Sequence, residues 1–528
     1  MSAEQDLANA NVQIANLISE VTRFRDAAMG LNAVYSTITE GRQNTADGKY
    51  FSVPGNGAYM RLYRRNGSQA QLIAEYPSRE SMVAAINEAT ADAEARANAA
   101  ADRAEVYADN KEFVTLERIR KQATLDLDFA SGDYALDDGD KVRSTNATDL
   151  LTVERVTPKW VEGPNGKLRE VPPNTIARAW RNGVPQGALI EESKTNLHLY
   201  STDITNAGVS RQNCDITVSS EVSPIIGQSA FTIEATAEGV SGIDSNSFSV
   251  VAGRKYTATV IAKAGTANGI SVVFKNFVTG WRAGTVNFDG TVDASVGLLW
   301  KLEEQYIIAD GWTFARVSCV ADQDSDSASI QYRVMNDEGD AGIGGTIHVA
   351  HWQVEEGEGS SIIPTTDSQV TRAGDDVYRT LGDEFNPLSW TLYLEVEKPE
   401  GAGGSLLSFS AEGNQANSRA PLFIQSDRAR FEIKDGEGGG VLTLSAPVDS
   451  FTKDVPHKMA IAVSSGYCAM AFNGAVVESS AVQFDPLAYT DMFLANNWTG
   501  GSPNRQITPK LSLHPRALSE QELQEITT

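Results

Sequence analysis

Residues 351–376 read HWQVEEGEGSSIIPTTDSQVTRAGDD, and this stretch decides how the chain is divided. Trp352 and Val354 alternate with polar residues, which is the period-2 pattern of a half-buried strand. Two glycines then end the strand, and Pro364 prevents the segment that follows from acting as a central strand. The pattern predicts a β-strand followed by a linker.

A second phrase, GVPQGALIEESKTNLHLYS at residues 183–201, joins the first in a wider resemblance. Both are similar to phrases that recur in tail fibres, the receptor-binding proteins of tailed bacteriophages, where they lead into and out of a β-sandwich. Residues 45–78 resemble the small β-module that lies between helical segments of such fibres. Residues 511–527, LSLHPRALSEQELQEIT, resemble the last strand and capping helix of laminin-G-like, concanavalin-type sandwiches.

The length and charge of the chain limit the classes of function. A chain of 528 residues is too long for one core, and it predicts about three or four units of ~100–200 residues each. The formal net charge of −25 argues against nucleic-acid binding, which needs a positive surface, and gives no attraction to an anionic membrane. If the target is an anionic glycan, local basic groups or bridging cations have to overcome the global repulsion.

The cysteines and the N-terminus bear on the compartment. Cys214, Cys319 and Cys468 are far apart and odd in number, which favours neither a disulfide framework nor a zinc site. The N-terminus shows no secretory signal, and no run of about 18 apolar residues occurs, so we expect no membrane insertion. We expect synthesis in the host bacterial cytoplasm, and the resemblance implies a place on the virion tail.

The predicted fold class is mostly β with an N-terminal α part, in which coiled-coil segments and a small β-module precede two antiparallel β-sandwiches. Many short runs at ~8–12-residue spacing predict the sandwich strands, and the resemblance supplies the names of the two sandwiches. The predicted parts are an N-terminal, virion-proximal coiled coil (1–34), a small β-module (35–78), an Ala-rich coiled-coil shaft (79–122), a β collar or linker (123–200), a jelly-roll, carbohydrate-binding-like sandwich (201–366) and a laminin-G/concanavalin-like sandwich (367–528).

Apolar residues in alternating three- and four-residue steps over residues 5–31 are typical of a coiled-coil seam. The two seam positions hold Leu7, Ile14, Val21 and Ala28, and Ala10, Leu17, Phe24 and Leu31. The alternative is one amphipathic helix packed on a domain. These residues do not decide between two and three strands, and the resemblance implies a homotrimer. Residues 79–121 continue the spacing with a mostly alanine seam, which buries little apolar area and needs partner chains or flanking modules.

Two short sequences predict hairpin turns. RRNGS at residues 64–68 lies between two alternating runs, and Asn473-Gly474 suits a type I′ turn because both positions tolerate a positive φ.

No catalytic signature occurs, so we predict a binding protein without catalysis, cofactor or metal. The chain has no Gly-x-Ser-x-Gly nucleophile elbow near a plausible Asp and His, and no Glu-x-Asp-x-x-Glu strand of concanavalin-type hydrolases. His348 and His351 lie three apart in a predicted strand and would face opposite sides. Asp322, Asp324 and Asp326 imitate the start of a calcium loop, but the sixth position is serine and the bidentate Glu is missing, so we interpret them as a solvated loop.

Sugar recognition uses aromatic faces that stack on the rings, with Asn, Asp and Arg bonding to the hydroxyls. Trp281 precedes Arg282 at a predicted hairpin tip, and Trp498 follows Asn497 before a glycine-rich turn. These four residues are the candidate glycan-binding residues, because a core role is less expected for large apolar residues in loops. Three tryptophans that open or line strands are predicted in the core instead: Trp312, Trp352 and Trp390.

We therefore predict a homotrimeric phage tail fibre that attaches the virion to a host cell-surface glycan without catalysis. Its expected partners are further copies of itself, other virion tail or baseplate proteins through the N-terminus, and host polysaccharide or lipopolysaccharide. One alternative is a tail-associated polysaccharide depolymerase. Another is a purely structural tail component.

Overall fold

The computed structural model describes residues 33–55, 60–76, 87, 90, 116, 118–137, 141–206, 208–291, 300–336, 339–398, 403–411, 418–434, 440–483, 488–497, 499 and 503–528, with the backbone alone at 76, 141 and 280–282. The chain divides into two units, residues 1–115 and 116–528, which are described separately. The coiled coil predicted over residues 1–34 lies almost entirely outside the described residues, as does most of the shaft predicted over 79–122.

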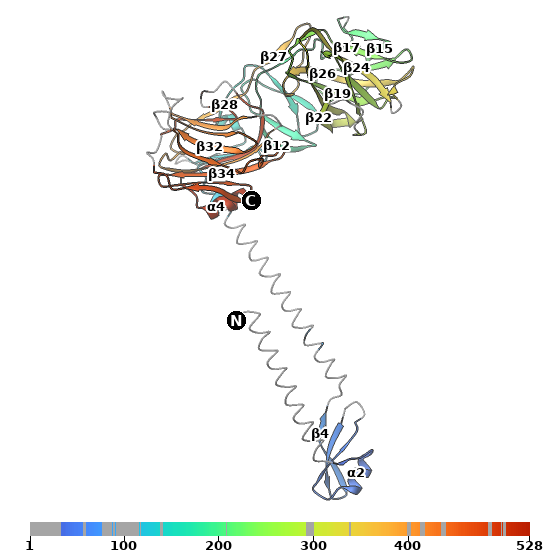
Figure 1. Ribbon diagram of the computed structural model, residues 1–528, viewed down its shortest axis with the longest axis vertical. Helices are drawn as coiled ribbons and strands as arrows, with labels where there is room; N and C mark the ends of the chain where they lie inside the picture. Colours follow the sequence, from blue (N-terminus) through green and yellow to red (C-terminus); the bar gives the residue numbers. More distant parts are fainter. Residues whose placement is uncertain are drawn as a thin grey trace. The chain divides into compact units, whose positions relative to one another are not determined.

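The described part of the first unit is a small β-module (blue in Figure 1). Its four strands lie in the order β1 (Ala33–Val34), β2 (Tyr50–Val53), β3 (Met60–Asn66) and β4 (Gln69–Tyr76), with helix α2 (Ile38–Asn44) between β1 and β2. The predicted hairpin forms between β3 and β4, where Gly67 has a φ of 60°. The module is held by a very small core, in which the rings of Phe51 and Tyr63 stack at 5.6 Å.

The second unit contains two antiparallel β-sandwiches, which confirms the mostly β fold class in its coarse form. The first sandwich spans Ser210–Glu356 and has two sheets. One sheet has the order β15 (Cys214–Val218), β16 (Phe231–Ala235), β26 (Thr346–Glu356), β19 (Lys255–Ala264), β23 (Thr313–Val320) and β22 (Trp300–Ile307). The other has the order β14 (Ser210–Gln212), β17 (Gly242–Asp244), β24 (Ser325–Asn336), β20 (Gly269–Val278) and β21 (Gly280–Asn287), with β18 (Phe248–Val250) and β25 (Gly339–Asp340) also paired to β24.

The second sandwich draws its strands from two distant parts of the chain. One sheet has the order β36 (Ala475–Ser480), β35 (Tyr467–Phe472), β34 (His457–Ser464), β29 (Ser389–Glu397), β38 (Gln506–His514), β5 (Leu125–Asp128), β6 (Asp133–Asp137) and β7 (Lys141–Ser144), and β12 (Val184–Ile190) joins β38 to β11 (Ala177–Arg181). The other has the order β33 (Gly440–Ser445), β32 (Ala429–Lys434), β31 (Arg419–Ile424), β30 (Gly404–Ser410), β37 (Asp491–Leu494), β28 (Asp376–Thr380) and β8 (Thr152–Glu154).

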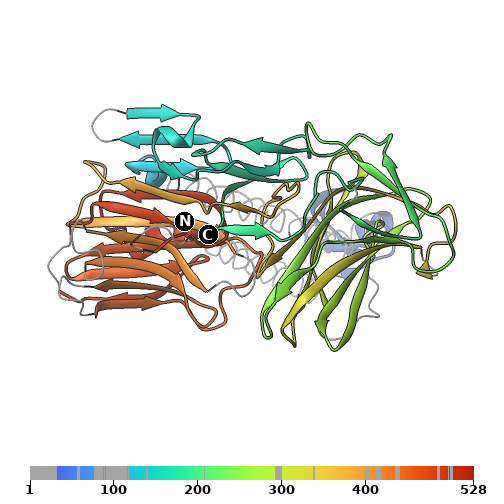
Figure 2. The ribbon, with the colours of Figure 1, turned by 90° about the horizontal axis from the view of Figure 1, so that it is seen from above.

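The stretch that we predicted as a separate collar, residues 123–200, supplies several of these strands. In Figure 2 the strands of this stretch, in cyan, lie alongside the orange and red strands of the C-terminal part. Leu125 and Leu127 of β5 are fully buried in the second core, because alternate residues of a strand face the same side. The first sandwich is therefore inserted into the second, between β12 and β28.

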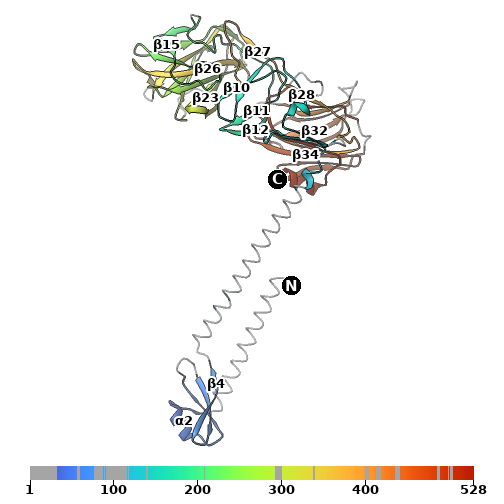
Figure 3. The ribbon, with the colours of Figure 1, turned by 180° about the vertical axis from the view of Figure 1, so that it is seen from behind.

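Short strands fill the junction of the two sandwiches. β9 (Lys159–Glu162) pairs with β10 (Leu168–Val171), and β13 (Lys194–Asn196) pairs with β27 (Val370–Arg372). Figure 3 shows β10, β11 and β12 between the strands of the two sandwiches.

The three tryptophans predicted in the core are all there, each no more than 1% exposed: Trp312, Trp352 and Trp390. The three cysteines are buried and form no disulfide bond with one another. The Asn473-Gly474 turn has both φ angles positive, at 47° and 83°, as a type I′ hairpin requires.

The chain ends in the predicted capping helix, α4 (Glu520–Thr527). Ser519 begins the helix with a capping box, in which its side chain and that of Glu522 each accept a backbone N–H of the other residue. Leu523 and Ile526 pack on alanines of β34 and β35, whose small side chains let the helix approach the sheet closely. Among the described residues, no helix combines the length and apolarity that crossing a membrane requires.

We expect Trp390→Ala to destabilise the second sandwich by about 3–5 kcal/mol, because it leaves a cavity among Phe385, Phe409 and Tyr489. Leu388→Ala is the matched control, since this neighbouring side chain is 65% exposed and its loss should cost little. Urea unfolding followed by tryptophan fluorescence measures both variants. Equal midpoints for the two would contradict this assignment of the core.

Candidate functional site

The two phrases that resemble tail fibres, residues 183–201 and 351–376, meet at the junction of the sandwiches. β13 and β27 pair antiparallel, with Lys194 opposite Arg372 and Asn196 opposite Val370. These two strands are where the chain enters and leaves the first sandwich. Both phrases therefore shape the connection between the sandwiches.

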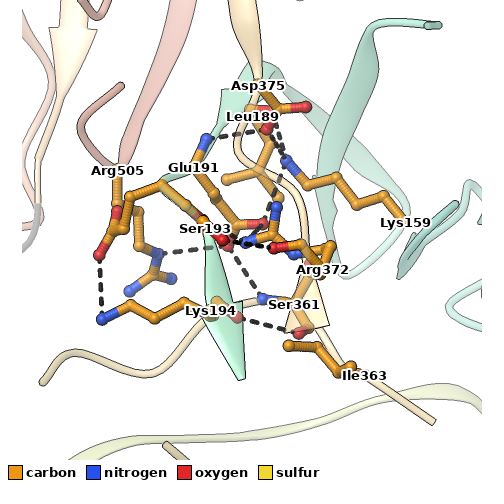
Figure 4. A network of polar contacts seen from close by, with 12 residues as sticks. Lys159, Leu189, Glu191, Ser193, Lys194, Ser361, Ile363, Arg372, Asp375 and Arg505 are labelled. Carbon is orange, nitrogen blue, oxygen red and sulfur yellow. Dashed lines mark hydrogen bonds and ion pairs between the residues drawn. The ribbon is translucent and has the colours of Figure 1, made fainter. Parts of the chain in front are cut away.

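A buried network of charged side chains holds this junction (Figure 4). Asp375 receives Arg155 Nη1 at 2.5 Å and Lys159 Nζ at 2.6 Å, and its Oδ2 also accepts the backbone N–H of Glu191 at 2.9 Å. Lys159 Nζ lies 3.1 Å from Glu191 Oε2. All four side chains are at most 3% exposed, so the surrounding protein screens these attractions far less than water would.

Glu191 is the centre of the network. Its carboxylate also lies 3.5 Å from Arg372 Nη2 and 3.7 Å from Arg505 Nε, and it accepts the backbone N–H of Ser361 at 2.9 Å. Burial alone would raise the pKa of Glu191, but the neighbouring Lys159, Arg372 and Arg505 outweigh burial and hold this pKa well below its usual range. The residue therefore stays a carboxylate that ties β12, β27 and β38 together.

Next to this network lies a cleft of about 340 Å³, which falls at the lower end of the range of about 300–1,000 Å³ typical of small-molecule sites. The first sandwich supplies one wall, with Glu303 to Tyr306 of β22 and Arg316 of β23. The second supplies the other, with Glu397, Lys398 and Gln506 near the ends of β29 and β38. A ligand here would touch both sandwiches.

Ion pairs fix the wall formed by the first sandwich. Glu304 lies 2.5 Å from Arg316 Nη1 and 3.3 Å from Arg181 Nη2. Burial would raise the pKa of Glu304, but Arg316, Arg505 and Arg181 outweigh burial and lower this pKa. The ring of Tyr306 stacks on Phe314 with centroids 5.1 Å apart. The ring of Tyr306 is thus held in one orientation beside the guanidinium groups of Arg181 and Arg316.

Several polar atoms of the cleft are buried without a hydrogen-bond partner among the described residues. They are Gln305 Oε1, Arg316 Nε, Lys398 Nζ and Gln506 Oε1. A buried polar atom left without a partner costs about 1–3 kcal/mol. The cleft thus holds two hydrogen-bond donors and two acceptors that need partners. Water, or a ligand that both donates and accepts hydrogen bonds, can satisfy them.

Burial also shifts the ionisation of groups in and beside the cleft. It lowers the pKa of Lys398 to about 8 and raises the pKa of Glu397. It raises the pKa of Glu162, in a small adjoining cavity, to about 7. Groups with perturbed pKa values gather at functional sites.

The four residues predicted to bind glycan lie elsewhere. Trp281 and Arg282 belong to the start of β21, where Trp281 is in register with Lys275, next to the expected hairpin tip. Asn497 follows β37, and its Oδ1 accepts both the backbone N–H and the hydroxyl of Thr499. Trp498 and the side chains of Trp281 and Arg282 lie outside the described residues. The role of these four residues stays a prediction.

The aspartate run has structural roles. Asp322, Asp324 and Asp326 accept hydrogen bonds from the Thr279 backbone, the Ala252 backbone and the Ser249 hydroxyl, respectively. Across the described part of the chain, no three His, Cys, Asp or Glu residues are grouped as a metal site requires.

Sequence reasoning missed the cleft, because its residues come from six separate strands and from the loops beside them. The one local signal was the run Glu303-Glu304-Gln305-Tyr306, which is unusually polar for a sandwich strand.

We expect Asp375→Asn to destabilise the protein by about 3–5 kcal/mol, since Arg155 and Lys159 would lose a buried counter-charge. Asp367→Asn in the same linker is the control, because that side chain is exposed. Differential scanning calorimetry of both variants provides the measurement. An unchanged Asp375→Asn transition would show that the network does not hold the junction.

The chain matches no protein-family model and no curated protein. It is similar to several solved β-domains at TM-scores of 0.23–0.25. One is the CBM40 domain of a Ruminococcus gnavus IT-sialidase bound to α2,3-sialyllactose, at 19% identity over 26% of this chain and 83% of that one. Two more are the binding domain of botulinum neurotoxin serotype D, at 12% identity over 29% of this chain and 40% of that one, and domain 4 of an extracellular arabinanase from Geobacillus stearothermophilus in complex with arabinotriose, at 12% identity over 33% and 82%. We draw nothing about function from overlaps of this size.

Proposed function

We propose that this protein binds a glycan in the cleft between its two sandwiches. The observation that carries the proposal is the set of buried donors and acceptors without partners on both walls, which includes Gln305 and Gln506. Each sugar hydroxyl both donates and accepts a hydrogen bond, so one polyhydroxylated ligand can satisfy such a mixed set. Tyr306 adds an aromatic ring beside these groups, as sugar sites commonly have.

At the level of the whole assembly, we propose a homotrimeric tail fibre that attaches a bacteriophage to a host surface polysaccharide or lipopolysaccharide. Support comes from the heptad of residues 5–31, and from the two tail-fibre-like phrases, which meet at the entrance and exit of an inserted sandwich. The N-terminal helix would face other virion tail or baseplate proteins, and the sandwiches would face the host. Three clefts in one particle would act together, so weak single sites would still give firm attachment.

A polysaccharide depolymerase is the second candidate, because two carboxyl groups near the cleft have opposite pKa shifts. The pKa of Glu162 is raised to about 7 by burial, and that of Glu304 is lowered by its arginines. Glycoside hydrolysis needs one protonated acid and one carboxylate. However, Glu304 is engaged by both Arg181 and Arg316, and Glu162 faces the smaller cavity of about 80 Å³. We therefore favour binding without catalysis.

We expect Gln305→Leu to weaken glycan binding at least about tenfold, because it removes a cleft acceptor that a sugar hydroxyl would fill. Gln323→Leu is the matched control, because this half-buried side chain of the first sandwich lies outside the cleft. A glycan array probed with the full-length protein identifies the ligand, and calorimetry then gives the affinities. Thermal melting of each variant separates lost binding from lost folding.

The same array distinguishes the rival locations and functions. Loss of binding in Trp281→Ala or Trp498→Ala, with Gln305→Leu unaffected, would move the site from the cleft to the sequence-predicted residues. New reducing ends from a bound polysaccharide would establish the depolymerase. Silence on the array, together with normal adsorption of virions that lack the protein, would favour the purely structural alternative.

We expect Leu17→Asp to dissociate the assembly, because a charge at a seam position finds no partner there. Multi-angle light scattering at micromolar concentration should give a mass of about three chains for the wild type and about one for the variant. A monomeric wild type would remove the support for a fibre.

A further inference from the structure

We propose that the ligand of the cleft is an acidic saccharide whose anionic group pairs with Lys398. This inference rests on the proposed glycan-binding function and adds the chemical class of the ligand. The shared chemistry is an oxyanion on a sugar, either a carboxylate or a phosphate.

Lys398 is the unusual group of the cleft. It follows the last residue of β29, and it is only 1% exposed. Its Nζ has no hydrogen-bond partner among the described residues. The carboxylate of Glu192 raises the pKa of Lys398 by electrostatic attraction, but Glu192 forms its ion pair with a different cation, Lys194, at 3.1 Å. A buried ammonium without a direct counter-ion is costly, so Lys398 needs an explanation.

The other fixed charges of the cleft are matched within the protein. Arg181 and Arg316 share Glu304, and Arg505 lies beside Glu191. On the acidic side, Glu303 and Glu358 both reach Lys255, at 2.7 and 2.8 Å. Because each of these charged side chains already has an oppositely charged partner, it attracts a charge on a ligand only weakly.

Glu397 does not compensate Lys398. Although the two are neighbours in sequence, no ion pair joins them within the part of the chain that the structure describes. Burial raises the pKa of Glu397. Lys398 is therefore a buried cation of the cleft with no hydrogen-bond partner among the described residues, on a chain whose net charge is −25. A single local cation of this kind selects for one anionic group on the ligand.

The ionisation of Lys398 provides a readout that a purely structural role would not share. Its pKa lies at about 8 because of burial, and an anion bound beside it would raise that value. Glu192 is the charged group that acts on it, and Glu397, Lys453, Asp454 and Arg505 are titratable or charged groups of the same cleft. Affinity for an acidic sugar should hold below about pH 8 and fall as the lysine loses its proton above it, whereas affinity for a neutral sugar should not follow this titration.

The test uses the full-length protein on a glycan array that carries neutral, uronic-acid, sialylated and phosphorylated glycans. We expect binding to acidic glycans above their neutral counterparts, and Lys398→Met should reduce it at least about tenfold at neutral pH. Lys434→Met is the control, since this lysine of the second sandwich lies outside the cleft and 3.4 Å from its partner Glu432. The uronic-acid and phosphate glycans distinguish the two sources of the oxyanion. Calorimetry on the best glycan from about pH 6 to about pH 9.5 then records the loss of affinity.

Each result of this test either supports the inference about Lys398 or overturns it. Preferential binding of acidic glycans that is lost in a folded Lys398→Met variant and above about pH 8 supports the inference. Binding of neutral glycans that is equal in wild type and Lys398→Met overturns it, while the proposed glycan-binding function stands. Binding to no glycan at all overturns the proposed function, and this inference with it.

Discussion

The structure depends on the buried attraction between Glu191 and Asp375 on one side and Lys159, Arg155 and Arg372 on the other. These residues come from segments that are almost two hundred positions apart, as the 184 positions between Glu191 and Asp375 show. Taking so many charges out of water is expensive, and the arrangement is stable only because each oxygen meets a cation or an N–H. Such directional contacts constrain the geometry of the junction, because each carboxylate oxygen needs its cation or N–H within bonding distance.

That fixed geometry is what makes the neighbouring cleft a plausible site. Arg505 belongs to the network through Glu191 and also lines the cleft, so the two share a wall. A site built between two sandwiches is useful for binding only if the sandwiches hold a constant distance from each other. The network keeps that distance constant, and the cleft holds Gln305 Oε1 and Lys398 Nζ without a hydrogen-bond partner among the described residues.

Much of the fold could be predicted from the sequence, because short local patterns of residues determine it. The alternation around Trp352 and the Asn473-Gly474 turn each depend on a few adjacent residues, and each appears in the structure. The insertion of one sandwich into the other could not be predicted this way. β5 pairs with β38, which is remote in the sequence, and the residues of either strand do not indicate which strand it pairs with. The cleft was missed for the same reason, and the four sequence-predicted binding residues await a test.

The insertion has a consequence for how the protein is made. Thr124 donates its backbone N–H to the carbonyl of Leu513, which is 389 positions further along the chain. At a ribosomal rate of ~5–20 residues per second, β5 waits on the order of tens of seconds for β38 to be synthesised. During that interval the inserted sandwich has all of its own strands and can fold first, while Leu125 and Leu127 remain uncovered. The second sandwich can therefore fold only when the chain is complete. A polypeptide released early would expose apolar strands with unpaired edges, which promote aggregation or chaperone binding.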